Sequence, residues 1–139
     1  MNIKTIVIMK KTILIILLSV TNIAVFGQVR LGTIAADIAT EFNESNYEQK
    51  SGYDKDNDYY ISITLEKSYV TYYFTSDKVC NLTIIIPKNQ GAINFYVENY
   101  NKQYVIVSSK QWKMYSESGI ANIELVYPEG GGCFFRWSN

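Results

Sequence analysis

Residues 79–104, VCNLTIIIPKNQGAINFYVENYNKQY, contain a strand, a proline stop and a helix in direct succession. The alternation over 79–86 predicts a strand with one buried face, formed by Cys80, Leu82, Ile84 and Ile86. Pro87 ends this strand because proline cannot donate a ladder hydrogen bond. Asn89 is the predicted N-cap of a helix. The apolar face of that helix is formed by Ile93, Tyr96, Val97 and Tyr100.

Upstream of this stretch, the sequence predicts a helix, a long polar loop and two strands. Residues 31–43 place apolar side chains three and four positions apart, which is typical of an amphipathic helix. Residues 43–58, NESNYEQKSGYDKDND, show no sustained apolar period and are expected to form a loop. Loops of this length are often functional, so the segment is a candidate contact site; a solvated loop without a role is the alternative. Strands are predicted over 59–66 and 69–75.

Downstream, a similar order of elements recurs. Strands are predicted over 104–108, 111–116 and 120–127, and a short strand over 133–137 has no counterpart in the first half. Shifting the first half by 41 residues places Pro87 on Pro128 and preserves side-chain parity; chance similarity of two ordinary stretches is the alternative.

The fold class that follows is α+β. We predict two tandem α-β-β-β units, residues 31–87 and 88–137, that form a mainly antiparallel sheet with two helices packed on one face. The side chains expected to be buried together are Leu31, Ile38, Phe42, Ile61, Ile63, Leu82, Ile84, Ile93, Val97, Ile123 and Leu125.

The N-terminus has the pattern of a secretion signal. Three lysines precede an uncharged apolar run of 15 residues, 12–26, whereas a membrane-spanning helix needs about 20. The small residues Val25 and Gly27 predict cleavage after Gly27; an uncleaved anchor is the alternative. Met9 is a second candidate translation start. The sequence thus predicts a signal peptide over 1–27 and one domain over 28–139, periplasmic or extracellular, with no stable membrane span.

Composition excludes several classes of function. The chain has 13 basic and 13 acidic residues, and removal of the predicted signal takes away three lysines, which leaves a net charge near −3. The remaining basic residues are scattered, so we expect no nucleic-acid partner. Histidine is absent, and with it the commonest general base and metal ligand. We therefore predict that the protein is not an enzyme and has no cofactor.

Three aspartates form a weak calcium candidate. Asp54, Asp56 and Asp58 have the spacing that opens a calcium-binding loop. The rest of the pattern fails, because Tyr59 stands where the turn glycine belongs and Leu65 where the bidentate glutamate belongs. An acidic turn without metal is the preferred interpretation.

Cys80 and Cys133 are the two cysteines of the chain and form a disulfide candidate. Export would take them to a compartment in which disulfides persist, and both are expected to face the core. Two free, buried thiols are the alternative. Neither is expected to be a nucleophile, because no histidine is present to deprotonate it.

Aromatic residues supply the candidate binding surface. The chain contains twelve tyrosines and two tryptophans, residue types that are enriched at interfaces. The alternative is that they form strands and cover a small core. The candidate binding residues are Tyr47, Tyr53, Tyr60, Tyr72, Trp112 and Tyr115.

The element order over 31–137 resembles, at the level of fold, the tandem α-β-β-β modules of the β-lactamase-inhibitor-protein and PepSY-like group. This resemblance implies an exported binding or inhibitory module with a concave sheet face. We carry over no functional residue, because the sequence matches no motif of that group.

The expected function is a non-catalytic binding module: an inhibitor, an immunity-type protein or an envelope-associated protein. Its partner would be another protein or an envelope component, held by the aromatic sheet face or by the 43–58 loop. The alternative is a small hydrolase, for example with a pair of carboxylates, or a carrier of hydrophobic ligands, with its site on the sheet face.

Overall fold

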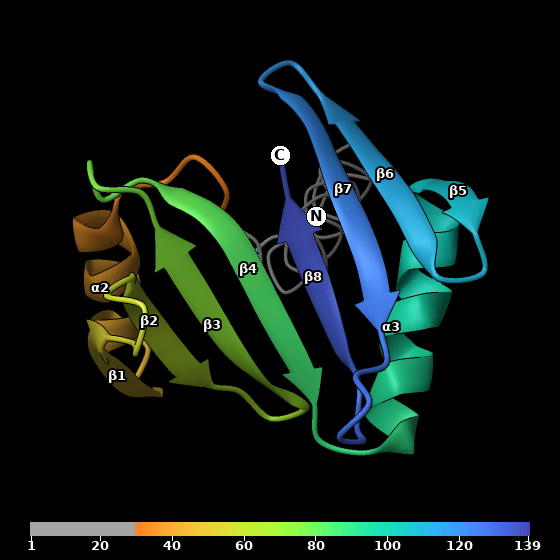
Figure 1. The fold of residues 1–139 in the computed structure, drawn as a ribbon, viewed down its shortest axis with the longest axis horizontal. Helices are drawn as coiled ribbons and strands as arrows, with labels where there is room; N and C mark the ends of the chain where they lie inside the picture. The colour runs from red at the N-terminus through yellow and green to blue at the C-terminus, as the bar shows by residue number, and fades with distance from the viewer. Residues whose placement is uncertain (1–29) are drawn as a thin grey trace, which may run out of the picture.

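The computed structural model describes residues 30–139, which form an α+β fold of two helices and one eight-stranded antiparallel sheet (Figure 1). The helices are α2 (Ala35–Glu44) and α3 (Gln90–Gln103). The strands are β1 (Glu48–Tyr53), β2 (Tyr59–Thr64), β3 (Ser68–Phe74), β4 (Cys80–Pro87), β5 (Val105–Ser108), β6 (Gln111–Ser116), β7 (Gly119–Val126) and β8 (Phe134–Ser138). Their order in the sheet is β1-β2-β3-β4-β8-β7-β6-β5, so the C-terminal strand lies at the centre (Figure 1).

Both described helices cover the same face of the sheet, as the sequence predicts. The ladder pairs Tyr72 with Thr83 and Thr83 with Trp137, so these buried side chains share one face. Helix α2 packs on that face through Phe42, whose ring centroid lies 6.0 Å from that of Tyr72. Helix α3 packs on it through Tyr100, 5.5 Å from Trp137. No described helix covers the opposite face.

Each helix is followed by four strands, so the prediction of three strands in the first half is one too low, whereas the three strands and the final strand predicted in the second half are all present. Residues 48–53, expected to be part of a loop, form β1, which pairs with β2 from Glu48 opposite Thr64 to Tyr53 opposite Tyr59. β1 is polar and mostly exposed at the sheet edge, so no apolar period marks it. In the sheet order, β8 is the counterpart of β4, because both are the innermost strands of their halves. The 41-residue shift instead places β4 on β7, so it aligns each strand with the wrong counterpart.

A β-bulge interrupts the pairing of β3 with β4. Phe74 lies opposite Cys80, but the next residue along, Tyr73, lies opposite Leu82. Asn81 is therefore an extra residue in β4. A bulge of this kind reverses which side of the sheet the following side chains occupy.

The buried face predicted for residues 79–86 is consequently wrong beyond Cys80. Thr83 and Ile85 have no exposed surface and face the helices. Leu82 and Ile84 are half-buried on the opposite face, and Ile86 is exposed there. The bulge thus turns three aliphatic side chains away from the core.

The described part of α3 contacts the sheet mainly through tyrosines. Ile93 and Val97, predicted to be buried, are only half-buried, whereas Tyr96 and Tyr100 are almost completely buried. The longer aromatic side chains reach the sheet, where Tyr100 meets Phe135 at 5.2 Å between ring centroids. The predicted cap is confirmed, because the Asn89 side chain accepts the backbone N–H of Ala92 at 2.8 Å.

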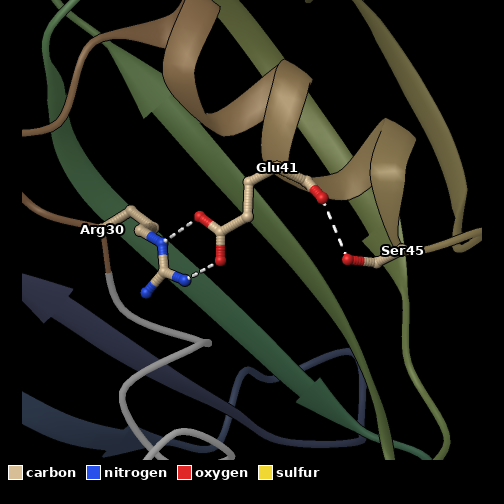
Figure 2. Close-up of polar contacts among 3 residues, drawn as sticks. All are labelled: Arg30, Glu41 and Ser45. Atoms are coloured by element: carbon tan, nitrogen blue, oxygen red, sulfur yellow. Dashed lines mark hydrogen bonds and ion pairs between the residues drawn. The ribbon is translucent and has the colours of Figure 1, made fainter.

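The first described residues are fastened to α2 and β4. The Arg30 guanidinium donates to both carboxylate oxygens of Glu41, with Nε 3.0 Å from Oε2 (Figure 2). Thr33 accepts the backbone N–H of Cys80 at 2.9 Å, and Ile34 forms a β-bridge with Val79. This extended pairing delays the helix to Ala35, so its predicted start at residue 31 is wrong. The predicted signal peptide over 1–27 lies outside the described residues.

Candidate functional site

The face of the sheet opposite α2 and α3, which we call the open face, carries a mixture of aromatic, aliphatic and polar groups. Three of its aliphatic side chains come from β4, because of the bulge at Asn81. Tyr69 and Ile86 on this face are 47% and 44% exposed, respectively. The side chains of the open face on β2, β3, β4 and β8 are Tyr60, Ser62, Thr64, Tyr69, Thr71, Tyr73, Leu82, Ile84, Ile86, Phe134, Arg136 and Ser138.

A depression of about 370 Å³ is sunk into the open face next to the bulge. This volume lies in the range of small-molecule pockets, roughly 300–1,000 Å³, but the depression is only partly enclosed. Its floor is aliphatic and aromatic, and its rim is polar. The lining residues are Asp54, Asp58, Tyr73, Phe74, Asn81, Leu82 and Ile84.

The two carboxylates of the rim come from the turn between β1 and β2. One oxygen of Asp54 accepts the backbone N–H groups of Asp56 and Asp58, both at 2.9 Å. The backbone N–H of Asp54 donates to the carbonyl oxygen of Asp58 at 3.0 Å, and Asn57 adopts a left-handed conformation with φ of 66°. Asparagine tolerates this conformation better than most residues. The turn therefore holds Asp54 and Asp58 at a fixed position beside the sheet.

Two carboxylates, those of Asp54 and Asp58, make the lining of the depression acidic. The pKa of Tyr73 is raised, first because the phenol is partly desolvated and then because Asp54, Tyr60 and Asp58 lie close to it. The same carboxylates that disfavour a tyrosinate would stabilise a positive charge brought to this place. An apolar floor with an acidic rim suits a group that is both aliphatic and cationic, such as a lysine or arginine side chain.

The described residues do not assemble the calcium candidate. Asp54 uses its carboxylate to cap the turn, and Asp56 does not line the depression with Asp54 and Asp58. Across residues 30–139, no three cysteine, aspartate or glutamate side chains are placed to hold a metal ion together.

Two of the six candidate binding aromatics lie in the core, so their assignment to a binding surface is wrong. Tyr72 is 0% and Trp112 1% exposed. The ladder pairs Tyr72 with Ile61 and Trp112 with Ile123, which places both on the face covered by the helices. Their burial follows from strand register, which side-chain type alone does not reveal.

The other four aromatics are accessible but are not brought together. Tyr47 lies against Phe42 of α2, and Tyr53 lies 2.9 Å from the Lys78 ammonium. Tyr115 is 60% exposed on β6. Tyr60 lies beside the depression, with its ring 6.3 Å from that of Tyr73. Of this predicted set, Tyr60 is the one that adjoins the site.

The two cysteines are free thiols, and the register of β4 and β8 explains why the chain does not bridge them. Cys80 begins β4, whereas Cys133 immediately precedes β8, beside the Pro87 end of β4. Seven residues along the strand separate these two levels, which is about 23 Å at roughly 3.3 Å per residue. A disulfide requires Cα atoms within about 7 Å. Burial also raises the pKa of the Cys80 thiol, which makes it a poor nucleophile.

The residues of the depression that the sequence did not indicate as a site are Tyr73, Phe74, Asn81, Leu82 and Ile84. Leu82 and Ile84 were expected in the core, and Tyr73 was not distinguished from Tyr72. Thr83, a polar residue between two aliphatic residues, was the one sequence feature that bears on the orientation of β4. It does not decide the orientation, because threonine occurs on both buried and exposed sides of strands. The bulge at Asn81 determines which side chains of β4 face the helices, and no sequence pattern indicates it.

Comparisons with protein-family models, with curated proteins and with solved structures found no match to this chain. The resemblance to β-lactamase-inhibitor-protein and PepSY-like modules therefore remains an expectation from the order of elements. Within residues 30–139, neither helix is long and apolar enough to cross a membrane.

Proposed function

We propose that the protein is an exported, non-catalytic binding module that holds a partner protein against the open face of its sheet. The observation that carries this proposal is the bulge at Asn81, which turns Leu82 and Ile84 outward beside the acidic turn. Leu82 and Ile84 are only half-buried, so part of their apolar surface stays in contact with water. A partner that covers them recovers the burial.

The chemistry of the depression favours a partner that presents a lysine or arginine side chain. Asp54 and Asp58 would pair with the cationic head, and the floor of Leu82 and Ile84 would contact the methylene stem. Small ligands are usually buried by 70–90%, whereas this depression is only partly enclosed. The shape therefore favours a protein surface over an enclosed small ligand.

Reversing the charge of Asp58 should weaken binding. The partner is first identified by capture from the cell envelope with the tagged protein, and its affinity is then measured by calorimetry. Asp58→Lys is expected to reduce the affinity by about tenfold or more, because the new lysine would repel the cationic side chain of the partner with which Asp58 pairs. Asp58 is suited to the test because its own carboxylate is not the group that caps the turn.

Glu117→Lys is the matched control, because it makes the same charge change at an exposed position in the turn between β6 and β7. It should leave the affinity within about twofold of the wild type, since screened charges interact weakly at a distance. Equal losses in both variants would indicate a general effect of net charge. Unchanged affinity in Asp58→Lys and in Ile84→Lys would remove the open face as the site.

Export itself is tested by the mass of the protein. Expression with its own leader in a bacterial host should yield a chain that begins at Gln28, with or without cyclisation of the glutamine. Intact-mass spectrometry of the protein recovered outside the cytoplasm measures this directly. A mass that retains residues 1–27 would contradict cleavage after Gly27 and would support the membrane-anchored alternative.

A further inference from the structure

The strand β5 (Val105–Ser108) forms one edge of the described sheet. It pairs with β6 on one side, and the strand order places no described strand on its other side. The backbone N–H and C=O groups that point outward from such an edge are ready to pair with another extended chain.

The side chains of β5 are apolar and exposed on both faces. Val105, Ile106 and Val107 are 53%, 56% and 52% exposed, respectively. Ile106 lies opposite Trp112, which is buried on the helix face, yet α3 leaves Ile106 uncovered. Three consecutive exposed β-branched residues are unusual on a free edge, because they favour association with other strands.

The opposite edge of the sheet is formed by β1, which carries charged residues that hinder pairing with another strand. β1 contains Glu48 and Lys50, whose side chains lie 3.6 Å apart, and both are strongly exposed. Gly52 of β1 lies under the ring of Tyr60. Charged side chains on an edge are a common defence against further pairing. β5 is only four residues long and its pairing with β6 shifts register between Ile106 and Ser108, but it contains no charged residue, so the two edges differ in charge.

The surroundings of β5 are basic. Lys102 lies in the last turn of α3 just before the strand, Lys110 follows the strand, and Lys113 lies opposite Val105 on the neighbouring strand. A second copy of this chain docked on the same edge would bring these like charges together. An extended segment with apolar residues between carboxylates would instead match both the apolar strand and the lysines around it.

We infer that β5 is a docking edge for an extended segment of another polypeptide, with alternating apolar residues and acidic flanks, which joins the sheet beside it. Main-chain hydrogen bonds would provide the pairing, and the lysines would select the flanks. This edge is separate from the depression, and the inference stands whether or not the open face binds a partner.

The test uses two synthetic peptides, EVTVTVE and its lysine-flanked twin KVTVTVK, titrated into ¹⁵N-labelled protein. The acidic peptide should shift the amide signals of residues 105–108 and bind at least about tenfold more tightly than the basic one, with affinity that falls as salt rises. Ile106→Glu should weaken binding of the acidic peptide by about tenfold or more, because it removes an apolar contact and places a carboxylate beside the acidic flanks of the peptide. Because Ile106 is exposed, this variant should fold, which its circular dichroism checks.

Ser51→Glu is the matched control, since it adds a glutamate at the other edge of the sheet, and it should leave peptide binding unchanged. Equal binding of the two peptides, or amide shifts that map away from β5, would overturn the inference. So would sedimentation equilibrium that shows a wild-type dimer and a monomeric Ile106→Glu variant, because the occupant would then be a second copy of this chain.

Discussion

Replacing Ile85 by alanine is expected to lower the free energy of unfolding by about 2–5 kcal/mol, whereas the same change at Ile84 should cost less than about 1 kcal/mol. Ile85 has no exposed surface and pairs with Val70 and Phe135 under the helices. Ile84 is half-buried on the open face. Urea denaturation of the purified variants, followed by circular dichroism, measures both values.

The comparison is sharp because the two residues are identical in type and adjacent in sequence. Leu125→Ala supplies a reference for a core position that is buried in β7 and that the sequence also places in the core. It should fall in the same range as Ile85→Ala. A larger loss at Ile84 than at Ile85 would mean that β4 has no bulge and that its faces are exchanged.

The sequence predicts an element well where one clear period marks it. Ile61 and Ile63 alternate with polar residues in β2, and Ile123 and Leu125 do so in β7, and all four are buried as expected. The α3 helix follows its proline stop and Asn89 cap. These signals are local, and local signals are sufficient for elements with one buried face.

Where the signal depends on a partner strand, prediction fails. β1 is polar because it lies at an edge, and only its pairing with β2 identifies it as a strand. The bulge at Asn81 is visible only when β4 is aligned with β3. Both features are set by tertiary pairing, which a single chain read by itself does not display.

The candidate site depends on the segments in which the sequence is least decisive. Tyr72 and Tyr73 are chemically equivalent neighbours, yet one is in the core and the other lines the depression. Leu82 and Ile84 are as apolar as Ile85. An alternating pattern assigns the polar side of a strand to the solvent and the apolar side to the core. An accessible face that is made of apolar residues is therefore assigned to the core, and its role in binding is missed.

Stability is expected to fall steeply as the pH rises above about 10, because two tyrosines are buried in the folded protein. Burial raises the pKa of Tyr72, and it raises that of Tyr100 although the Trp137 indole donates to its oxygen at 3.2 Å. In the unfolded chain both phenols ionise near pH 10. Above that pH the unfolded state releases protons that the folded state keeps, so stability is complete below pH 10 and decreases above it. Each tyrosine contributes about 1.4 kcal/mol per pH unit.

Urea titrations at pH 8 and at intervals from pH 10 to 11.5 test this dependence through tyrosine-to-phenylalanine variants. Tyr100→Phe should cost about 1–3 kcal/mol at pH 8, because the Trp137 N–H loses its acceptor, but its stability should fall less steeply at high pH. Tyr72→Phe should also flatten the alkaline slope. Tyr115→Phe, at a position 60% exposed, should change neither quantity. An alkaline slope that is the same in all three variants would show that other groups, such as Tyr104, whose pKa is also raised by burial, drive the unfolding and that these two tyrosines do not.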